Sequence, residues 1–255
     1  MVKIFLHGCC GRMGKAIANL CLHSDEYQIV AGGDIITNPD FKFPVYTNVN
    51  DCTEDFDVII DFSNASAVPT VLEFAKSRKK PLVCCTTALS DETVADILKA
   101  SEDIAVFKSA NMSVGINLII ELAKQATKIL YPEFDIEIVE AHHNRKLDAP
   151  SGTAMMIANA IDQEIPDQTE FVYDRHSVNK ARTKQEIGIS SIRGGNIVGD
   201  HDVMFISDEE IVTLSHRAQT RDVFAKGALR AAKFMSGKER GYFTMSDIIA
   251  EYTGE

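Results

Sequence analysis

The sequence predicts an α/β protein, with an N-terminal doubly wound parallel sheet and a second α+β domain built on an open mixed sheet. Over residues 1–113, short apolar runs alternate with helical patterns, as in a parallel sheet joined by crossover helices. After residue 135, strand-like runs instead follow one another, with a hairpin pattern around Ser207–Glu210. We therefore expect one domain at 1–113, completed by 219–255, and a second domain at 114–218.

Composition and charge restrict the functional classes. The chain has 255 residues, of which 45% are hydrophobic, so it can form two modest cores. No apolar run approaches the length of a membrane-spanning helix, and Val2–Leu6 is too short for a signal peptide. The formal charge of −11 argues against a general nucleic-acid binder. We expect a cytoplasmic protein that binds neither nucleic acid nor membrane.

The six cysteines do not form a metal-binding motif. No CxxC pair occurs, and no Cys/His set has zinc spacing, so no metal site is expected. We interpret the adjacent pairs Cys9-Cys10 and Cys84-Cys85 as small, reduced residues of a cytosolic protein. A catalytic thiol is the second interpretation.

A glycine-rich turn follows the first strand. Val2–His7 is a short apolar run, and Gly8-Cys-Cys-Gly-Arg-Met-Gly14 comes next, before a helix to about Leu22. Gly8 allows the tight turn, Gly11 lets the backbone approach a pyrophosphate, and Gly14 lets helix and strand pack closely. This context favours a dinucleotide site. The residues expected to hold the cofactor here are Gly8, Cys9, Cys10, Gly11, Arg12 and Met13.

An acidic residue ends the second predicted strand. Asp34 follows Tyr27–Ala31 and lies 20 residues beyond Gly14, where a carboxylate binds the adenosine ribose hydroxyls of dinucleotides. The alternative is that Asp34 only begins the turn toward Asn38-Pro39. Because of the upstream glycines, we favour ribose binding.

Further strand and helix patterns complete both domains. Thr86 and Thr87 end a strand, where they can face a ligand or only cap the next helix. A polar, loop-like stretch covers residues 163–184. The other expected strands are 57–63, 81–87, 104–107, 187–193, 203–206 and 211–215, and the helices are 67–79, 91–100, 114–130 and 224–235, with Gly237 as the last helix's C-cap.

The densest group of ionisable residues lies between a strand and a helix. Asp135–Val139 alternates as a strand, and Ala154–Ile161 has one apolar helical face. Between them stands Glu140-Ala-His-His-Asn-Arg-Lys-Leu-Asp-Ala-Pro-Ser-Gly-Thr. Ser151 is a plausible N-cap, and the free N–H groups of a helix start suit a carboxylate. Single charged loop residues are usually just solvated, but five ionisable groups within the seven residues 142–148 favour function.

The motif His142-His143-x-x-Lys146-x-Asp148-Ala-Pro-Ser-Gly-Thr153 resembles the signature of the dihydrodipicolinate reductases of the lysine (diaminopimelate) pathway. Asp57–Ser63 and Ser109–Gly115 also resemble segments of that family, so the likeness covers nearly the whole chain. It implies a Rossmann-like N-terminal domain, a homotetramer, and NAD(P)H-dependent reduction of 4-hydroxy-tetrahydrodipicolinate, a dicarboxylate, to tetrahydrodipicolinate with loss of water. The alternatives are another nicotinamide enzyme, such as an amino-acid dehydrogenase, and a non-catalytic nucleotide sensor.

The resemblance also implies residue roles. Lys146 is the expected general acid, His142 its partner in proton transfer, and His143 a ligand of a substrate carboxylate. Asp148 and Arg145 are interpreted as structural ions. The second carboxylate is assigned to Ser151, Gly152 and Thr153, and Thr87 is also expected to contact substrate. The further cofactor residues implied are Cys85, Thr86, Thr87, Ser109, Ala110, Asn111 and Met112.

Two departures from the family pattern concern the cofactor. The family usually has G-T-T-G where this chain has Cys85-Thr-Thr-Ala88, so the approach to the nicotinamide should survive with slightly altered geometry. An arginine that meets the 2′-phosphate of NADPH often follows the acidic residue, and this chain has Ile35. The expected cofactor is therefore NADH, NADPH or both.

Overall fold

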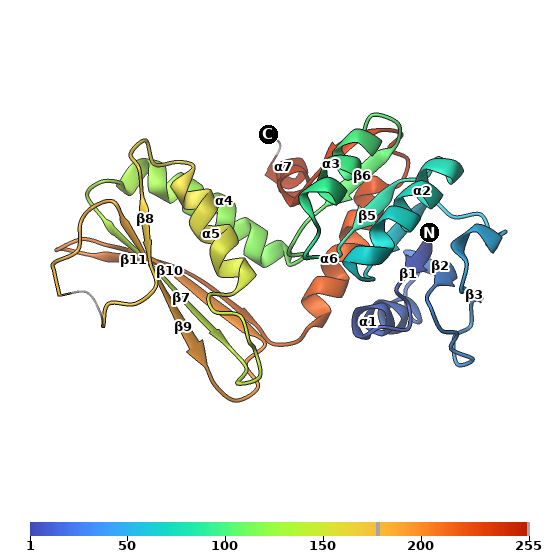
Figure 1. Cartoon of the computed structure of the whole chain (residues 1–255), viewed down its shortest axis with the longest axis horizontal. Helices are drawn as coiled ribbons and strands as arrows, with labels where there is room; N and C mark the ends of the chain where they lie inside the picture. Colours follow the sequence, from blue (N-terminus) through green and yellow to red (C-terminus); the bar gives the residue numbers. More distant parts are fainter. Residues whose placement is uncertain (177–178, 254–255) are drawn as a thin grey trace. The chain divides into compact units, whose positions relative to one another are not determined.

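The computed structural model describes residues 1–176 and 179–253. The chain divides into two compact units (Figure 1). Unit 1 comprises Met1–Val114 and Asp222–Glu255, and unit 2 comprises Gly115–Arg221. No helix in the described residues is both long and apolar enough to span a membrane. The predicted fold class, a parallel sheet followed by a separate mixed sheet, is confirmed.

Unit 1 is built on a parallel sheet of seven strands in the order β12-β6-β5-β4-β1-β2-β3. Successive strands run outward on both sides of β1, so the strand order reverses between β1 and β4. In such sheets, ligands bind beyond the carboxyl ends of the strands at this reversal. The strands are β1 (Val2–His7), β2 (Tyr27–Gly33), β3 (Val45–Tyr46), β4 (Val58–Asp61), β5 (Leu82–Cys84), β6 (Ala105–Lys108) and β12 (Gly241–Phe243).

Helices cover both faces of this sheet, so its strands are apolar on both sides. Leu6 and Ile60 pack in a core with α1 (Arg12–Cys21) and α6 (Asp222–Met235). Phe5 and Ile59 point into a second core with α2 (Val68–Arg78) and α3 (Asp91–Ala100). The remaining elements are α7 (Met245–Thr253) and the short 3₁₀ turns η1 (Val49–Asp51) and η2 (Ala65–Ala67).

Unit 2 is a five-stranded mixed sheet in the order β11-β10-β7-β9-β8, in which β10 is antiparallel to both neighbours. Its helices α4 and α5 lie on one face of this sheet (Figure 1). Side chains on that face, such as Ile138 and Val203, are fully buried, whereas Val139 and Met204 on the opposite face are half-buried. The elements are α4 (Val114–Leu130), β7 (Asp135–His142), α5 (Gly152–Asp162), β8 (Glu170–Val172), β9 (Glu186–Arg193), β10 (Gly199–Ile206) and β11 (Ile211–Ala218).

Apart from the short 3₁₀ turns, four elements of the described residues were missed in the sequence, and three of them are short edge strands. β3 has two residues and β12 and β8 three each, and all are fixed by pairing with one neighbour rather than by a periodic pattern. β8 lies within the stretch expected to be a loop. The fourth, α7, follows Thr244, whose N–H and hydroxyl both donate to Asp247 Oδ2, at 2.7 and 2.9 Å. The predicted hairpin at Ser207–Glu210 is confirmed by a backbone hydrogen bond of 2.9 Å.

Candidate functional site

The glycine turn between β1 and α1 has the close packing that its spacing predicts. Gly8 has φ +76°, and a Cβ there would lie 2.5 Å from the carbonyl oxygen of Phe62. A Cβ on Gly14 would lie 2.3 Å from the oxygen of Gly8. No side chain caps the start of α1, because its N-cap is Gly11. The first N–H groups of α1 are therefore open to an anion such as a pyrophosphate.

Asp34 lies next to this turn, just beyond β2. Its Oδ2 accepts a hydrogen bond from the Cys10 N–H at 2.9 Å, and its Oδ1 accepts one from the Ile35 N–H at 2.8 Å. The Ile35 side chain is 87% exposed and supplies no charge. A cavity of about 330 Å³ opens here, lined by Gly8, Cys10, Gly11, Asp34, Ile35 and Phe62 among others. The structure thus joins the two predicted nucleotide-binding segments around one cavity.

A buried carboxylate that sequence reasoning did not select lies beside the turn. Asp61, fully buried at the end of β4, accepts hydrogen bonds from Ser63 Oγ at 2.6 Å and Thr86 Oγ1 at 2.7 Å, and its Oδ1 lies 2.7 Å from His7 Nδ1. The Thr86 hydroxyl therefore links the segment after β5 to the end of β4, while Thr87, the next residue, is exposed. The signal that could have identified Asp61 is a carboxylate at the end of the apolar run 58–60.

The predicted cofactor segment Ser109–Met112 is a tight turn after β6. Ser109 Oγ donates to the oxygen of Asn111 at 2.7 Å, and Asn111 Oδ1 accepts from the Ser113 N–H at 2.8 Å. Ala110 is exposed, whereas Met112 is 3% exposed and packs in the core. These contacts fix the backbone of the turn and leave Ala110 as its exposed residue.

In unit 2, the centre of the predicted signature loop is Glu140, which is fully buried. Its carboxylate accepts two hydrogen bonds from the Arg193 guanidinium, at 2.9 and 2.7 Å, and lies 2.6 Å from His142 Nδ1. Burial raises the pKa of Glu140, but the hydrogen bonds from Arg193, Ser191 and His142 outweigh it and lower the pKa to about 2. Glu140 is therefore a permanent anion that orients the His142 ring.

Sequence reasoning gave Glu140 and Arg193 no role. The alternation of buried and exposed residues along the predicted strand could have placed Glu140 on the buried face. Ile136, Ile138, Glu140 and His142 alternate along β7 on its buried face. A glutamate on that face needs a cation, and Arg193 ends the neighbouring strand β9, with His142 paired to it in register. A Cβ on Gly199 would lie 3.1 Å from His142 Nε2, so this glycine makes room for the ring.

Lys146 and His143 lie on the loop that leaves β7. Lys146 Nζ pairs with Asp148 Oδ1 at 2.8 Å, and this hydrogen bond lowers the pKa of Asp148. Burial, followed by the charges of Arg145 and Arg221, lowers the pKa of His143. Arg145 donates to Asn196 Oδ1 at 2.9 Å. The loop therefore gathers fixed positive charge around a half-buried imidazole that favours its neutral form.

The N-terminus of α5 completes this part of unit 2. Ser151 caps the helix through a hydrogen bond from the Ala154 N–H at 3.1 Å, as predicted. The same hydroxyl lies 3.2 Å from His201 Nε2, and the Ser151 N–H donates to Glu140 Oε1 at 3.1 Å. Burial, with a smaller contribution from His142, lowers the pKa of His201 to about 4. Gly152 lies beside open space, since a Cβ there would meet nothing within 4 Å.

The two units together define the class of protein. Unit 1 has the strand order, the glycine turn and the acidic strand end of a dinucleotide-binding domain. Unit 2 carries a histidine, a lysine and a helix start suited to an anion. This combination is that of the two-domain NAD(P)H-dependent oxidoreductases.

Comparison with known proteins narrows this class to one family. The family models "Dihydrodipicolinate reductase, N-terminus" and "Dihydrodipicolinate reductase, C-terminus" match residues 2–112 and 115–249. The 4-hydroxy-tetrahydrodipicolinate reductases of Caldanaerobacter subterraneus subsp. tengcongensis and Clostridium botulinum are 49% and 47% identical to this chain, over 98% of it and 98% of each relative. The chain belongs to the dihydrodipicolinate reductase family, and is an NAD(P)H-dependent reductase.

A solved structure supports the fold. The dipicolinate-bound dihydrodipicolinate reductase from Paenisporosarcina sp. TG-14 matches with a TM-score of 0.83 at 22% identity, and the match covers 97% of this chain and 99% of that one. The family models and the curated relatives, rather than this structure, confirm the resemblance read from the signature loop and the reductase activity that it implied.

Proposed function

We propose that unit 2 binds 4-hydroxy-tetrahydrodipicolinate through the carboxylates of this substrate, and that His142 and Lys146 transfer the proton that completes the reduction. The product is tetrahydrodipicolinate, formed with loss of water in the diaminopimelate route to lysine. The observation that carries this assignment is the Glu140–His142 pair at 2.6 Å, on the strand that leads into the Lys146 loop. The dipicolinate bound to the Paenisporosarcina protein supports a small dicarboxylate as ligand.

In this proposal the glycine turn and Asp34 would hold the dinucleotide, which would supply a hydride for C4 of the dehydrated substrate. The Lys146 ammonium, charged at neutral pH, holds a carboxylate and donates the proton that completes the reduction. Because His142 Nδ1 faces the Glu140 carboxylate, Nε2 is the atom that exchanges a proton. Asp148 positions Lys146 at 2.8 Å until the substrate carboxylate competes for the ammonium.

The carboxylates are assigned to His143, Gly152 and Thr153, and Thr87 stays a predicted substrate contact. The open space at Gly152 and the start of α5 support this assignment. For Ser151 we propose an indirect part. Its N–H donates to Glu140, its hydroxyl caps α5, and the residue is 1% exposed. Ser151 therefore shapes the helix start that we propose to face the substrate carboxylate.

For the cofactor we propose that NADH is used at least as well as NADPH. The Asp34 carboxylate suits ribose hydroxyls and repels a 2′-phosphate, and Ile35 offers no cation to offset this repulsion. Arg12, within the glycine turn, and Lys42 are the cations proposed to admit NADPH as well. Steady-state kinetics with each cofactor tests the proposal: kcat/KM more than about tenfold higher with NADPH, or about 1.4 kcal/mol, contradicts it.

Substitution of Lys146 tests the acid role. In a coupled assay, the substrate is generated from aspartate semialdehyde and pyruvate by the upstream synthase. Lys146→Ala should lower kcat by roughly 10²–10⁴-fold, and His142→Ala should lower kcat as well. Arg145→Ala is the matched control and should keep kcat, because Arg145 lies one position away and its guanidinium donates to Asn144 Oδ1 and Asn196 Oδ1. A saturating kcat within threefold of wild type in folded Lys146→Ala contradicts the acid role.

We also propose a cytoplasmic homotetramer assembled through unit 2. The sheet face opposite α4 and α5 carries the partly exposed apolar side chains Val139, Met204, Ile192 and Ile211, which suits an interface between copies. Light scattering after size exclusion should give four times the chain mass of 28.1 kDa. Met204→Lys should lower that mass, and a monomeric wild type contradicts the proposal.

A further inference from the structure

Cys9, Cys10 and Asp34 place two thiols and a carboxylate together in the first turn of unit 1. The two Sγ atoms are 4.0 Å apart, and one ligand atom from each of the three residues lies within 4.8 Å of the others. Within residues 1–176 and 179–253, no other group of three His, Cys, Asp or Glu ligands meets this spacing. We propose that this cluster binds one thiophilic divalent cation of the Zn²⁺ class, and that the bound ion excludes the dinucleotide.

The spacing of the sulfurs fits such an ion. With Zn–S bonds of about 2.3 Å, sulfurs 4.0 Å apart subtend an angle of about 120° at the ion, close to tetrahedral. The third ligand is also in reach. Each oxygen of Asp34 accepts one backbone N–H, from Cys10 or Ile35, and a carboxylate oxygen has a second acceptor position. Water completes the coordination.

The cluster has an entrance on one side. Cys10 and Asp34 both line the cavity of about 330 Å³ beside Gly8 and Gly11, whereas Cys9 is fully buried and does not line it. An ion that enters from the cavity meets Asp34 and Cys10 first, and Cys9 comes within reach because its Sγ lies 4.0 Å from that of Cys10. Two sulfur ligands select Zn²⁺ or Cd²⁺ over Mg²⁺ and Ca²⁺, which prefer oxygen.

Exclusion of the cofactor follows from shared atoms. The Asp34 carboxylate is the proposed ribose ligand, and the Cys9-Cys10 backbone belongs to the turn that the pyrophosphate approaches. An ion held between the two thiols and Asp34 therefore occupies the space that the ribose and the pyrophosphate would need. This second half of the inference rests on the proposed cofactor role, whereas binding of the ion does not.

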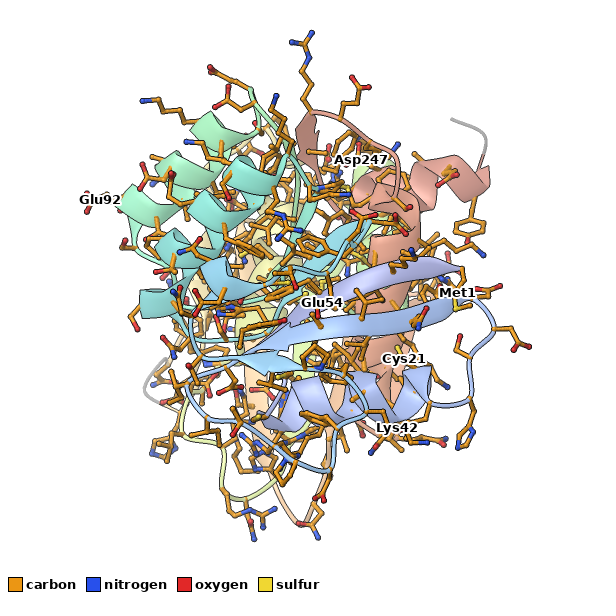
Figure 2. All side chains as sticks on the ribbon, turned by 90° about the vertical axis from the view of Figure 1, so that its right-hand side faces the viewer. Met1, Cys21, Lys42, Glu54, Glu92 and Asp247 are labelled. Atoms are coloured by element: carbon orange, nitrogen blue, oxygen red, sulfur yellow. The ribbon has the colours of Figure 1, made fainter. Side chains whose placement is uncertain are left out.

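The binding half is tested on the reduced, metal-free full chain. Titration with Cd²⁺ should produce a thiolate-to-metal absorption band in the ultraviolet that saturates at one ion per chain. Cys10→Ser should abolish the band, and Asp34→Asn should weaken ion binding by tenfold or more. Cys21→Ser is the control, because Cys21 lies at the far end of α1 (Figure 2), and should leave the band unchanged. Thermal unfolding of each variant checks that it is folded.

The exclusion half is tested by NADH binding, followed by its fluorescence with and without one equivalent of Cd²⁺. The ion should weaken NADH binding at least tenfold in wild type and not in Cys10→Ser. Absence of a band at one ion, or a band that persists in folded Cys10→Ser, overturns the site. A band without any effect on NADH overturns the exclusion. Failure of the metal-free protein to bind NADH at all instead contradicts the proposed cofactor role and leaves the ion site standing.

Discussion

Replacement of Glu140 by glutamine should remove a large part of the stability of unit 2. The carboxylate is fully buried and meets Arg193, His142 and the Ser151 N–H. A pKa lowered from 4.5 to about 2 corresponds to about 3 kcal/mol, at 1.36 kcal/mol per pKa unit. Loss of one partner of a buried ion pair typically costs about 3–5 kcal/mol, in agreement. We therefore expect Glu140→Gln to lower the free energy of unfolding by about 3 kcal/mol.

The same group predicts how stability depends on pH. The pKa of Glu140 is lower in the folded than in the unfolded chain, so between about pH 4.5 and pH 2 the unfolded chain binds a proton that the folded chain does not. The contribution of Glu140 is complete above pH 4.5 and is lost as the pH falls through that window. In Glu140→Gln this acid-dependent contribution should be absent.

Urea unfolding followed by circular dichroism measures both effects. Glu133→Gln is the matched control, because Glu133 is an exposed glutamate two residues before β7 begins. The control should keep the wild-type midpoint at neutral pH, and Glu140→Gln should not. Equal midpoints for the two variants, or an unchanged loss of stability below pH 4.5 in Glu140→Gln, would refute the reasoning. The catalytic rate should also fall, since His142 loses its anionic partner.

Three further outcomes are expected. His143→Ala should raise KM with little change in kcat, because a carboxylate contact made in both ground and transition states is uniform binding; steady-state kinetics with an equal loss in kcat would contradict this. Ala88→Gly should raise the free energy of unfolding by about 0.5–1 kcal/mol. Ala88 has φ +56°, and the cost of this left-handed conformation for alanine outweighs the extra backbone entropy that glycine loses on folding. As a control, Ala95→Gly inside α3 should lower the free energy of unfolding. Thr86→Val removes a hydrogen-bond donor to buried Asp61 and should lower the free energy of unfolding, measured by thermal unfolding, by about 1–3 kcal/mol.

Periodic patterns made most of the fold predictable. Val114–Leu130 and Asp91–Ala100 have the bounds expected from their apolar spacing and caps, because a single apolar face fixes a helix locally. β12 could not be found in this way. It has three residues, and only its pairing with β6, over a hundred residues earlier, makes it a strand.

The candidate site was predictable where the chain is contiguous and not where partners come from distant segments. His142, His143, Lys146 and the Ser151 cap follow each other on one loop and were read together. Arg193 joins Glu140 from 53 residues away, through the register of β7 and β9. His201 reaches Ser151 from β10 in the same way. Such contacts depend on strand pairing, which local spacing does not specify.

Gly227 in α6 also determines when unit 1 can be finished during synthesis. A Cβ there would lie 1.7 Å from the oxygen of Met112, so the helix packs directly on backbone made more than a hundred residues earlier. Until α6 leaves the ribosome, the sheet face that holds Leu6 and Ile60 has no α6 to cover it. Part of the apolar sheet face of unit 1 therefore stays uncovered while the whole of unit 2 is translated. A chain truncated at residue 114 should therefore aggregate or recruit chaperones rather than fold as an independent nucleotide-binding domain.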